Sequence, residues 1–239
     1  MYRDLAKWWP LLSPVEDYAE ETEVLRSVFD EKLGAGRHML LDLGVGGGHH
    51  LSHLTARFDA VAVDISPEML ENSRRLNPSV EHHVADMRQV RLRRSFDAVL
   101  VHDAVDYLLS REDIEQMLAT VVAHLRPGGV LVLCPDWFKE TFVDQSVWQT
   151  THARNGTSLT YIEYVHDPDP SDTTIESIMF FLIRERGEVR IEQDRHVMGL
   201  FPRSQWIDLV RRAGFAVQTR SNGSSNHGQA LTLIVGVKN

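Results

Sequence analysis

The sequence predicts an α/β fold in which a doubly wound parallel sheet carries an inserted antiparallel β platform. Over the first 135 residues, short apolar runs alternate with segments of helical periodicity. Between residues 158 and 201, long strand-like segments follow one another with no helical pattern between them. Strands that alternate with helices pair in parallel through right-handed crossovers, whereas consecutive strands joined by short turns pair in antiparallel fashion.

Five apolar runs in the first part end at glycine, proline or polar residues and indicate strands. They span 39–43, 58–64, 80–86, 96–102 and 130–134. Helices are expected between them, and two of these helices have suitable first residues in Ser66 with Pro67 and in Ser110. The segment RPGG at 126–129 ends the second of these helices.

The second part of the chain contains three strand-like segments, with Gly187 at the hairpin turn between the last two. These segments span 158–166, 173–185 and 188–201. A helical segment, SQWIDLVRRAGF, follows them and ends near Gly214. Two further strand-like segments, FAVQTRS and ALTLIVGV, then complete the first sheet.

Charge and cysteine content restrict the classes of partner. The net charge of −9 argues against nonspecific binding to nucleic acid or to an anionic membrane. The apolar runs are too short to span a bilayer, and the N-terminal segment MYRDLAKWWP lacks the regions of a signal peptide. A single cysteine, Cys134, cannot form an internal disulfide and fits a reducing compartment. We therefore expect a cytoplasmic protein.

A glycine-rich loop, LLDLGVGGGHH at 40–50, follows the first strand and opens a helix over 47–58. Gly44, Gly46 and Gly48 allow backbone amides to approach a ligand at a helix N-terminus. The loop is not a dinucleotide fingerprint, because His49 stands where the third glycine is required, and it lacks the Gly-Lys-Ser/Thr end of a phosphate-binding loop. The loop therefore matches neither motif, and other residues have to identify the ligand.

Three carboxylates narrow the choice of ligand, since the carboxyl ends of parallel strands meet at one edge of the sheet. Asp64 follows the second strand and can accept both hydroxyls of a ribose, Asp86 can accept from an adenine amine, and Asp42 can face an ammonium group. A ribose, an adenine and an ammonium without phosphate describe S-adenosyl-L-methionine (SAM).

The order of the motifs resembles that of the class I SAM-dependent methyltransferases. LLDLGVGGG, VAVDISPEML, VADMRQV, FDAVLVHDAVDYL and LRPGGVLVL carry this resemblance over residues 38–135. It implies a Rossmann-like sheet of seven strands whose last strand is antiparallel to the others. It also implies cofactor contacts from Ile65, Met69, Met87 and His102, and from Trp8 in YRDLAKWW, which resembles an N-terminal segment that folds over SAM.

Other segments resemble the nucleotide-sugar amine N,N-dimethyltransferases, namely PDWFKETF and DRHVMGLFPRSQWIDLVRRAGF. This resemblance implies that an antiparallel insertion forms the acceptor pocket. Two features differ from that group. Tryptophan or leucine replaces the N-terminal tyrosine, and residues 139–202 hold six Lys or Arg against eleven Asp or Glu, although recognition of a diphosphate requires arginines.

We therefore expect residues 1–138 and 203–239 to bind SAM, and 139–202 to form the acceptor pocket or a dimer surface. The leading hypothesis is methylation of nitrogen or oxygen in a small molecule. Two alternatives stay open: a nucleotide-amino-sugar N-methyltransferase, and a SAM-binding protein without turnover. A homodimer is compatible with each of them.

The acceptor side is expected to contain two candidate general bases, His102 after the fourth strand and His196 in the insertion. Acceptor contacts are expected from four residues: Trp137, Asp103, Tyr107 and Arg195. His49 and His53 are spaced for a metal but lack a third ligand in the sequence, so no metal site is expected.

Overall fold

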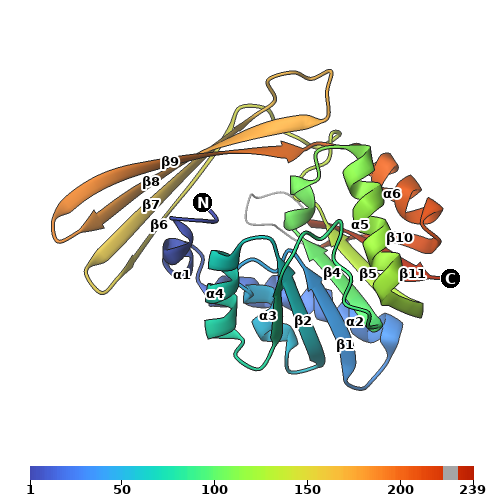
Figure 1. Cartoon of the computed structure of the whole chain (residues 1–239). Helices are drawn as coiled ribbons and strands as arrows, with labels where there is room; N and C mark the ends of the chain where they lie inside the picture. Colours follow the sequence, from blue (N-terminus) through green and yellow to red (C-terminus); the bar gives the residue numbers. More distant parts are fainter. Residues whose placement is uncertain (223–230) are drawn as a thin grey trace.

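The computed structural model describes residues 1–222 and 231–239 and contains two sheets (Figure 1). Seven strands form the larger sheet: β1 (His38–Leu43), β2 (Phe58–Asp64), β3 (Glu81–Val84), β4 (Phe96–His102), β5 (Leu125–Cys134), β10 (Phe215–Asn222) and β11 (Leu231–Lys238). Their spatial order is β10-β11-β5-β4-β1-β2-β3. The first five pair in parallel, and β11 is antiparallel to both neighbours. The seven-stranded sheet with an antiparallel last strand is thus confirmed.

The strands of this sheet carry apolar side chains on both faces, and helices cover both faces. The longer helices are α2 (Ala19–Leu33), α3 (His49–Leu54), α4 (Pro67–Leu76), α5 (Arg111–His124) and α6 (Arg203–Arg212). On one face Leu41 and Val99 pack with Ile114 of α5 and Trp206 of α6. On the other face Leu40 packs with the residues of α2 and α3. None of the helices in the described ranges is both long and apolar enough to cross a membrane.

The expected first residues of two helices are confirmed. The Oγ atom of Ser66 accepts a hydrogen bond from the Met69 amide at 3.0 Å, and that of Ser110 accepts one from the Asp113 amide at 3.1 Å. Helix α3 is shorter than expected, because Gly48 adopts a left-handed conformation directly before it. Helix α2 was not predicted, since its hydrophobic residues are few and its surface is highly charged.

Four antiparallel strands form the second sheet, which we call the platform: β6 (Ser146–Arg154), β7 (Thr157–His166), β8 (Thr174–Glu185) and β9 (Glu188–Gly199). The sequence indicated three of them. Strand β6 was missed because it is an edge strand with no fully buried residue and a polar composition. The Gly187 turn between β8 and β9 is confirmed, and its φ of 88° requires glycine or a strained residue.

The N-terminal segment lies between the two sheets (Figure 1). It contains three short helices, η1 (Ala6–Trp8), α1 (Trp9–Leu12) and η2 (Val15–Tyr18). Leu12 packs with Leu159, Tyr161 and Phe181 on the inner face of the platform, while η1 and α4 lie against each other. The segment therefore contacts the platform on one side and helices α3 and α4 on the other, and its residues Tyr2, Trp9 and Tyr18 cover the edge at which the parallel strands end.

Candidate functional site

A cavity of about 380 Å³ lies at the carboxyl ends of the parallel strands, beneath the N-terminal segment. Most of the residues expected to bind cofactor or acceptor line it: Asp42, Gly44, Gly46, Asp64, Ile65, Met69, Asp86, Met87, His102, Asp103 and Tyr107. They come from β1, β2 and β4 and from the segments that follow β1 to β4. Residues from distant parts of the sequence meet here because parallel strands share one carboxyl edge.

The glycines of the loop at 44–48 let the backbone pack closely against neighbouring segments and border the cavity. Gly44 has a φ of +80°, and a side-chain carbon at this position would collide with the methyl group of Ala104. At Gly48, with a φ of +78°, such a carbon would collide with Ser73 and Asn77 on α4. Gly48 is not among the lining residues. Its role is therefore to let α3 start close to α4, while Gly44 and Gly46 border the cavity.

Asp64 is fixed by backbone amides at the end of β2. Its Oδ2 accepts from the Gly46 amide at 2.7 Å, and its Oδ1 accepts from the Ser66 amide at 2.8 Å. Burial raises the pKa of this carboxyl group, while the amide hydrogen bonds act in the opposite direction. Each carboxylate oxygen retains a second lone pair, so that Asp64 can accept hydrogen bonds from ribose hydroxyls without losing its amide partners.

Asp42 lies deeper, at the end of β1, with 4% of its surface exposed. Burial raises its pKa to about 7, and the nearby charge of His102 opposes this rise. A buried carboxyl group with a raised pKa is stabilised as a carboxylate by any cation that enters the cavity.

The carboxylate of Asp86 is held by Arg88, with 2.7 Å between Oδ2 and Nη2. Arg88 also donates to Asp113 of α5 at 2.5 Å. The hydrogen bonds from Arg88 lower the pKa of Asp86. Asp86 and Arg88 both line the cavity, so the carboxylate that was assigned to the adenine amine is charged and has a fixed orientation.

His102 is buried between two carboxylates. Its Nδ1 lies 2.6 Å from Oδ1 of Asp103, and its Nε2 lies 2.8 Å from Oε1 of Glu21. Burial by itself lowers the pKa of His102, but Asp103 and the neighbouring Cys134 outweigh burial and raise it well above the usual value. Both ring nitrogens of the resulting imidazolium donate hydrogen bonds. This side chain consequently has no lone pair for the general-base role expected from the sequence.

His196 differs from His102 in its charge. Its Nδ1 lies 2.6 Å from the Tyr107 hydroxyl, which in turn lies 3.1 Å from the hydroxyl of Tyr2. Burial lowers the pKa of His196 to about 4, so the imidazole is neutral near pH 7. These three side chains join the platform, the segment after β4 and the N-terminal segment at one side of the cavity.

Besides Gly48 and His196, three other residues with expected roles lie outside the cavity lining. Trp8 borders a neighbouring groove, where Arg190 lies 5.3 Å from the centre of its ring. Trp137 is buried with Val165 and other apolar residues at the base of the platform. Arg195 is exposed and pairs with Glu176, with 3.0 Å between Nε and Oε2.

The aromatic cover of the cavity comes instead from Tyr2, Trp9 and Tyr18. Two tyrosines of the N-terminal part, Tyr2 and Tyr18, therefore face the site, and neither was expected to do so from the sequence. Tyr2 stands at the start of the quoted segment YRDLAKWW. No periodicity could have identified it, since the segment consists of short turns whose orientation depends on the platform.

Comparison with known proteins identifies the family. Residues 40–129 match the model of a methyltransferase domain. The chain is 32% identical, over 93% of its length and 92% of the relative, to the dTDP-3-amino-3,4,6-trideoxy-α-D-glucopyranose N,N-dimethyltransferase of Streptomyces venezuelae. It is 30% identical, over 79% of its length and 74% of the relative, to the dTDP-3-amino-3,6-dideoxy-α-D-glucopyranose N,N-dimethyltransferase of Streptomyces fradiae. The chain belongs to this family of SAM-dependent methyltransferases.

Solved structures agree with this assignment. DesVI of Streptomyces venezuelae superposes with a TM-score of 0.85 at 29% identity, covering 100% of this chain and 99% of that protein. A SAM-bound amino pentose methyltransferase of Micromonospora echinaspora superposes with a TM-score of 0.79 at 26% identity, covering 93% and 92%. The protein is thus a SAM-dependent methyltransferase with a Rossmann-like fold, and the alternative of a SAM-binding protein without turnover is set aside.

A first prediction concerns Asp64. Replacing Asp64 by alanine should weaken SAM binding by about 1.5–3 kcal/mol, or roughly 10- to 150-fold, because two hydrogen bonds to ribose hydroxyls are lost. Isothermal titration calorimetry measures the change. Asp59→Ala, which removes an exposed carboxylate of the same strand, is the matched control and should bind SAM normally. Unchanged affinity in Asp64→Ala would exclude the ribose contact.

A second prediction concerns the proton on Asp42. SAM carries an ammonium group, so binding should favour the carboxylate, and affinity should rise by about tenfold between about pH 6 and about pH 7.5.

The raised pKa of Asp42 also affects the stability of the free protein, which should decrease as the pH rises. The folded state keeps this proton longer than the unfolded chain, and stability falls as pH rises from about 4 to about 7. Both dependences should flatten in Asp42→Asn, as measured by calorimetry and by urea unfolding. An equally steep affinity profile in the variant would contradict the assignment.

Proposed function

We propose that this enzyme transfers the methyl group of SAM to the amino group of a sugar bound to a nucleoside diphosphate. The observation that carries the proposal is the closure of the SAM cavity by the platform and the N-terminal segment through Tyr2, Tyr107 and His196. Such an enclosed site suits a small acceptor. Both relatives named above are called amino-sugar N,N-dimethyltransferases, which favours nitrogen over oxygen.

Methyl transfer to an amine requires the protein to position the acceptor nitrogen more than it requires a general base. The lone pair of the acceptor nitrogen attacks the methyl carbon, the carbon–sulfur bond breaks, and S-adenosylhomocysteine leaves as a neutral thioether. The positive charge passes to the nitrogen, which then loses a proton to water. Holding the nitrogen in line with the methyl group accounts for up to roughly 7–11 kcal/mol of barrier reduction. Neutral His196, fixed to Tyr107, suits orientation of the acceptor.

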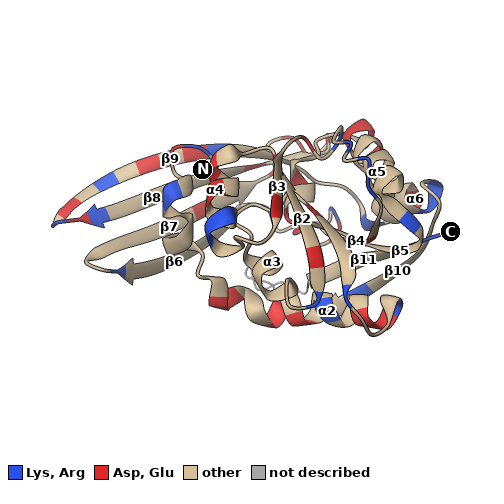
Figure 2. Cartoon of the chain, turned by 60° about the horizontal axis from the view of Figure 1, so that its bottom comes forward, with Lys and Arg blue, Asp and Glu red and all other residues tan. Residues whose placement is uncertain are grey.

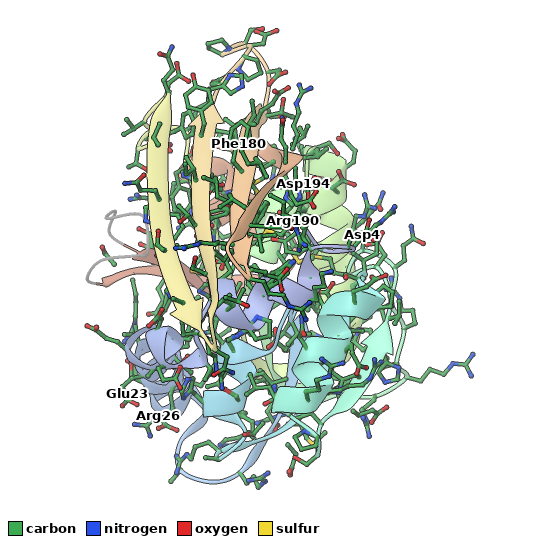
Figure 3. All side chains as sticks on the ribbon, turned by 90° about the vertical axis from the view of Figure 1, so that its left-hand side faces the viewer. Asp4, Glu23, Arg26, Phe180, Arg190 and Asp194 are labelled. Carbon is green, nitrogen blue, oxygen red and sulfur yellow. The ribbon has the colours of Figure 1, made fainter. Side chains whose placement is uncertain are left out.

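A groove beside His196 supports a nucleotide-linked acceptor. It contains Arg3, Lys7 and Arg190, and the last two lie 5.6 and 5.3 Å from the ring centre of Trp8. Figure 3 shows Arg190 and Asp194 on β9 beside the N-terminal segment that carries Asp4. Although the platform is acidic as a whole, Figure 2 shows blue and red segments alternating along β9. The groove also contains the carboxylates of Asp4, Glu192 and Asp194. We propose that Trp8, assigned to the cofactor from sequence, contacts the nucleotide instead, with Arg3, Lys7 and Arg190 near its diphosphate.

The acceptor is tested with SAM labelled in its methyl group and dTDP-3-amino-3,6-dideoxy-α-D-glucopyranose, the compound in the name of the Streptomyces fradiae relative. Mass spectrometry should show one or two labelled methyl groups on the amine, and none on dTDP-glucose, which has a hydroxyl at that position. Tyr107→Phe and His196→Gln should each lower kcat/KM by about 10- to 100-fold. His166→Gln should not, because His166 is on β7, two strands away from His196, and contacts Glu176 instead of Tyr107. Transfer to dTDP-glucose alone would refute the preference for nitrogen.

We also propose that the outer face of the platform pairs with a second copy of the chain. Four hydrophobic side chains are exposed on this face: Val147 at 64%, Val189 at 60%, Ile191 at 66% and Val197 at 38%. Ile191 pairs with Leu182 in the antiparallel register. Exposed apolar patches of this kind mark association surfaces, and a face that continues across four strands suits a symmetric contact.

Light scattering coupled to size exclusion tests this association. The wild type should have the mass of a dimer, and Ile191→Lys should shift it toward the monomer because a charge would be buried in the contact. Val143→Lys is the matched control, since Val143 is 58% exposed but precedes β6 and lies outside the sheet. A monomeric wild type would rule out the dimer. We also propose a cytoplasmic location, which the single cysteine Cys134 favours because it fits a reducing compartment.

A further inference from the structure

Four side chains that bind transition metals meet below the cavity: Glu21 of α2, His50 of α3, and His102 and Cys134 at the ends of β4 and β5. One ligand atom each of Glu21, His102 and Cys134 lies within 4.8 Å of the others. His50 adds its Nε2 atom at 3.7 Å from Oε2 of Glu21. The rings of His50 and His102 have their centres 4.1 Å apart. Neighbouring strands bring the last two ligands together, since His102 and Cys134 are partners in the β4–β5 register.

The hydrogen bonds around His50 leave one lone pair free to bind a metal. The Thr22 hydroxyl donates to the Tyr18 carbonyl at 2.6 Å, so its oxygen accepts from Nδ1 of His50 at 2.8 Å. The proton of the neutral ring is therefore on Nδ1. Its Nε2 atom is buried and has no hydrogen-bond partner, although His50 is only 8% exposed. A buried lone pair without a donor costs free energy unless a cation occupies the space beside it.

His102 has the same orientation with a stronger outer partner. Its Nδ1 lies 2.6 Å from the Asp103 carboxylate, and its Nε2 is directed at Glu21. An imidazole whose outer nitrogen donates to a carboxylate while the inner nitrogen faces other ligands is the usual arrangement of a metal-binding histidine. His50 differs in that its outer nitrogen donates to the Thr22 hydroxyl, while its inner nitrogen likewise faces Glu21.

We propose that Glu21, His50, His102 and Cys134 bind one Zn²⁺ ion as a closed structural site. A thiolate, two imidazoles and a carboxylate match the preference of zinc for nitrogen and sulfur ligands, and four protein ligands leave no open position for catalysis. Zn²⁺ would displace the thiol proton of Cys134 and the proton between His102 and Glu21. His50 and His102 line the cavity, which provides the entry path.

The ion would connect helix α2 to the seven-stranded sheet. Of the four ligands, Glu21 is on α2 and the others are on elements that border the glycine loop or end at the cavity. Zinc would thus fix α2, and with it Tyr18 of the cavity cover, in place. This function is independent of the acceptor, since it concerns the stability of the SAM site and not the transferred methyl group.

Cobalt substitution tests the site directly, because the chain has a single cysteine. Metal-free wild type titrated with Co²⁺ should bind one equivalent and develop a thiolate-to-cobalt absorption band, which can come only from Cys134. Zn²⁺ should displace the cobalt, and the Tm should rise with the logarithm of the free Zn²⁺ concentration. Cys134→Ser should lose the band, and Asp103→Asn should weaken Zn²⁺ binding by roughly 10- to 100-fold.

His53→Gln is the matched control, because His53 is on the same helix but its Nε2 lies 3.0 Å from the Val15 carbonyl, away from the cluster. It should bind Co²⁺ like the wild type, whereas His50→Gln should not. Unchanged SAM binding in Cys134→Ser without metal would show that this variant is folded. Absence of the thiolate band at stoichiometric Co²⁺, or equal Zn²⁺ affinity in wild type and Cys134→Ser, would overturn the proposal. Neither readout involves methyl transfer, so the outcome is separate from that of the acceptor experiment.

Discussion

The ion pairs of His102 with Glu21 and Asp103 are the interaction on which the cavity depends. Parallel strands place carboxyl groups at one edge, and burial makes each additional negative charge there costly. Burial and the neighbouring carboxylates raise the pKa values of Asp106 and Asp136 well above the usual range. The buried imidazolium of His102 therefore keeps Asp103 charged, while Asp106 and Asp136 favour the protonated form.

The same charge balance explains why this edge suits SAM. In this cavity, a space bordered by Asp42, Asp64 and Asp103, SAM would bring a sulfonium and an ammonium group. Asp103 itself has a φ of 43°, a conformation that is strained for a residue with a side chain. The strain is compensated by its hydrogen bond to His102, and strained residues of this kind are concentrated at functional sites. A zinc ion in place of the two protons would supply the cationic charge at the same point.

A second set of contacts closes one side of the cavity. The hydroxyls of Tyr2 and Tyr107 and the imidazole of His196 connect three segments that are distant in sequence. Each has a pKa that burial shifts toward the neutral form. In the proposed function, an acceptor between them would meet uncharged donors and acceptors, which would orient a nucleophile without adding charge beside the sulfonium.

The sequence by itself determined the α/β sheet, the glycine loop and the positions of Asp42, Asp64 and Asp86, because strand periodicity and the carboxyl-end rule are local properties. It could not determine the protonation of His102, since that depends partly on Cys134 of the neighbouring strand β5, nor its contact with Glu21, which is 81 residues away in the chain. Nor could it show that Tyr2, Tyr18 and Trp9, rather than Trp8, cover the cavity. Those placements follow from packing of the N-terminal turns between two sheets, and only tertiary contacts set the orientation of segments that have no periodicity of their own.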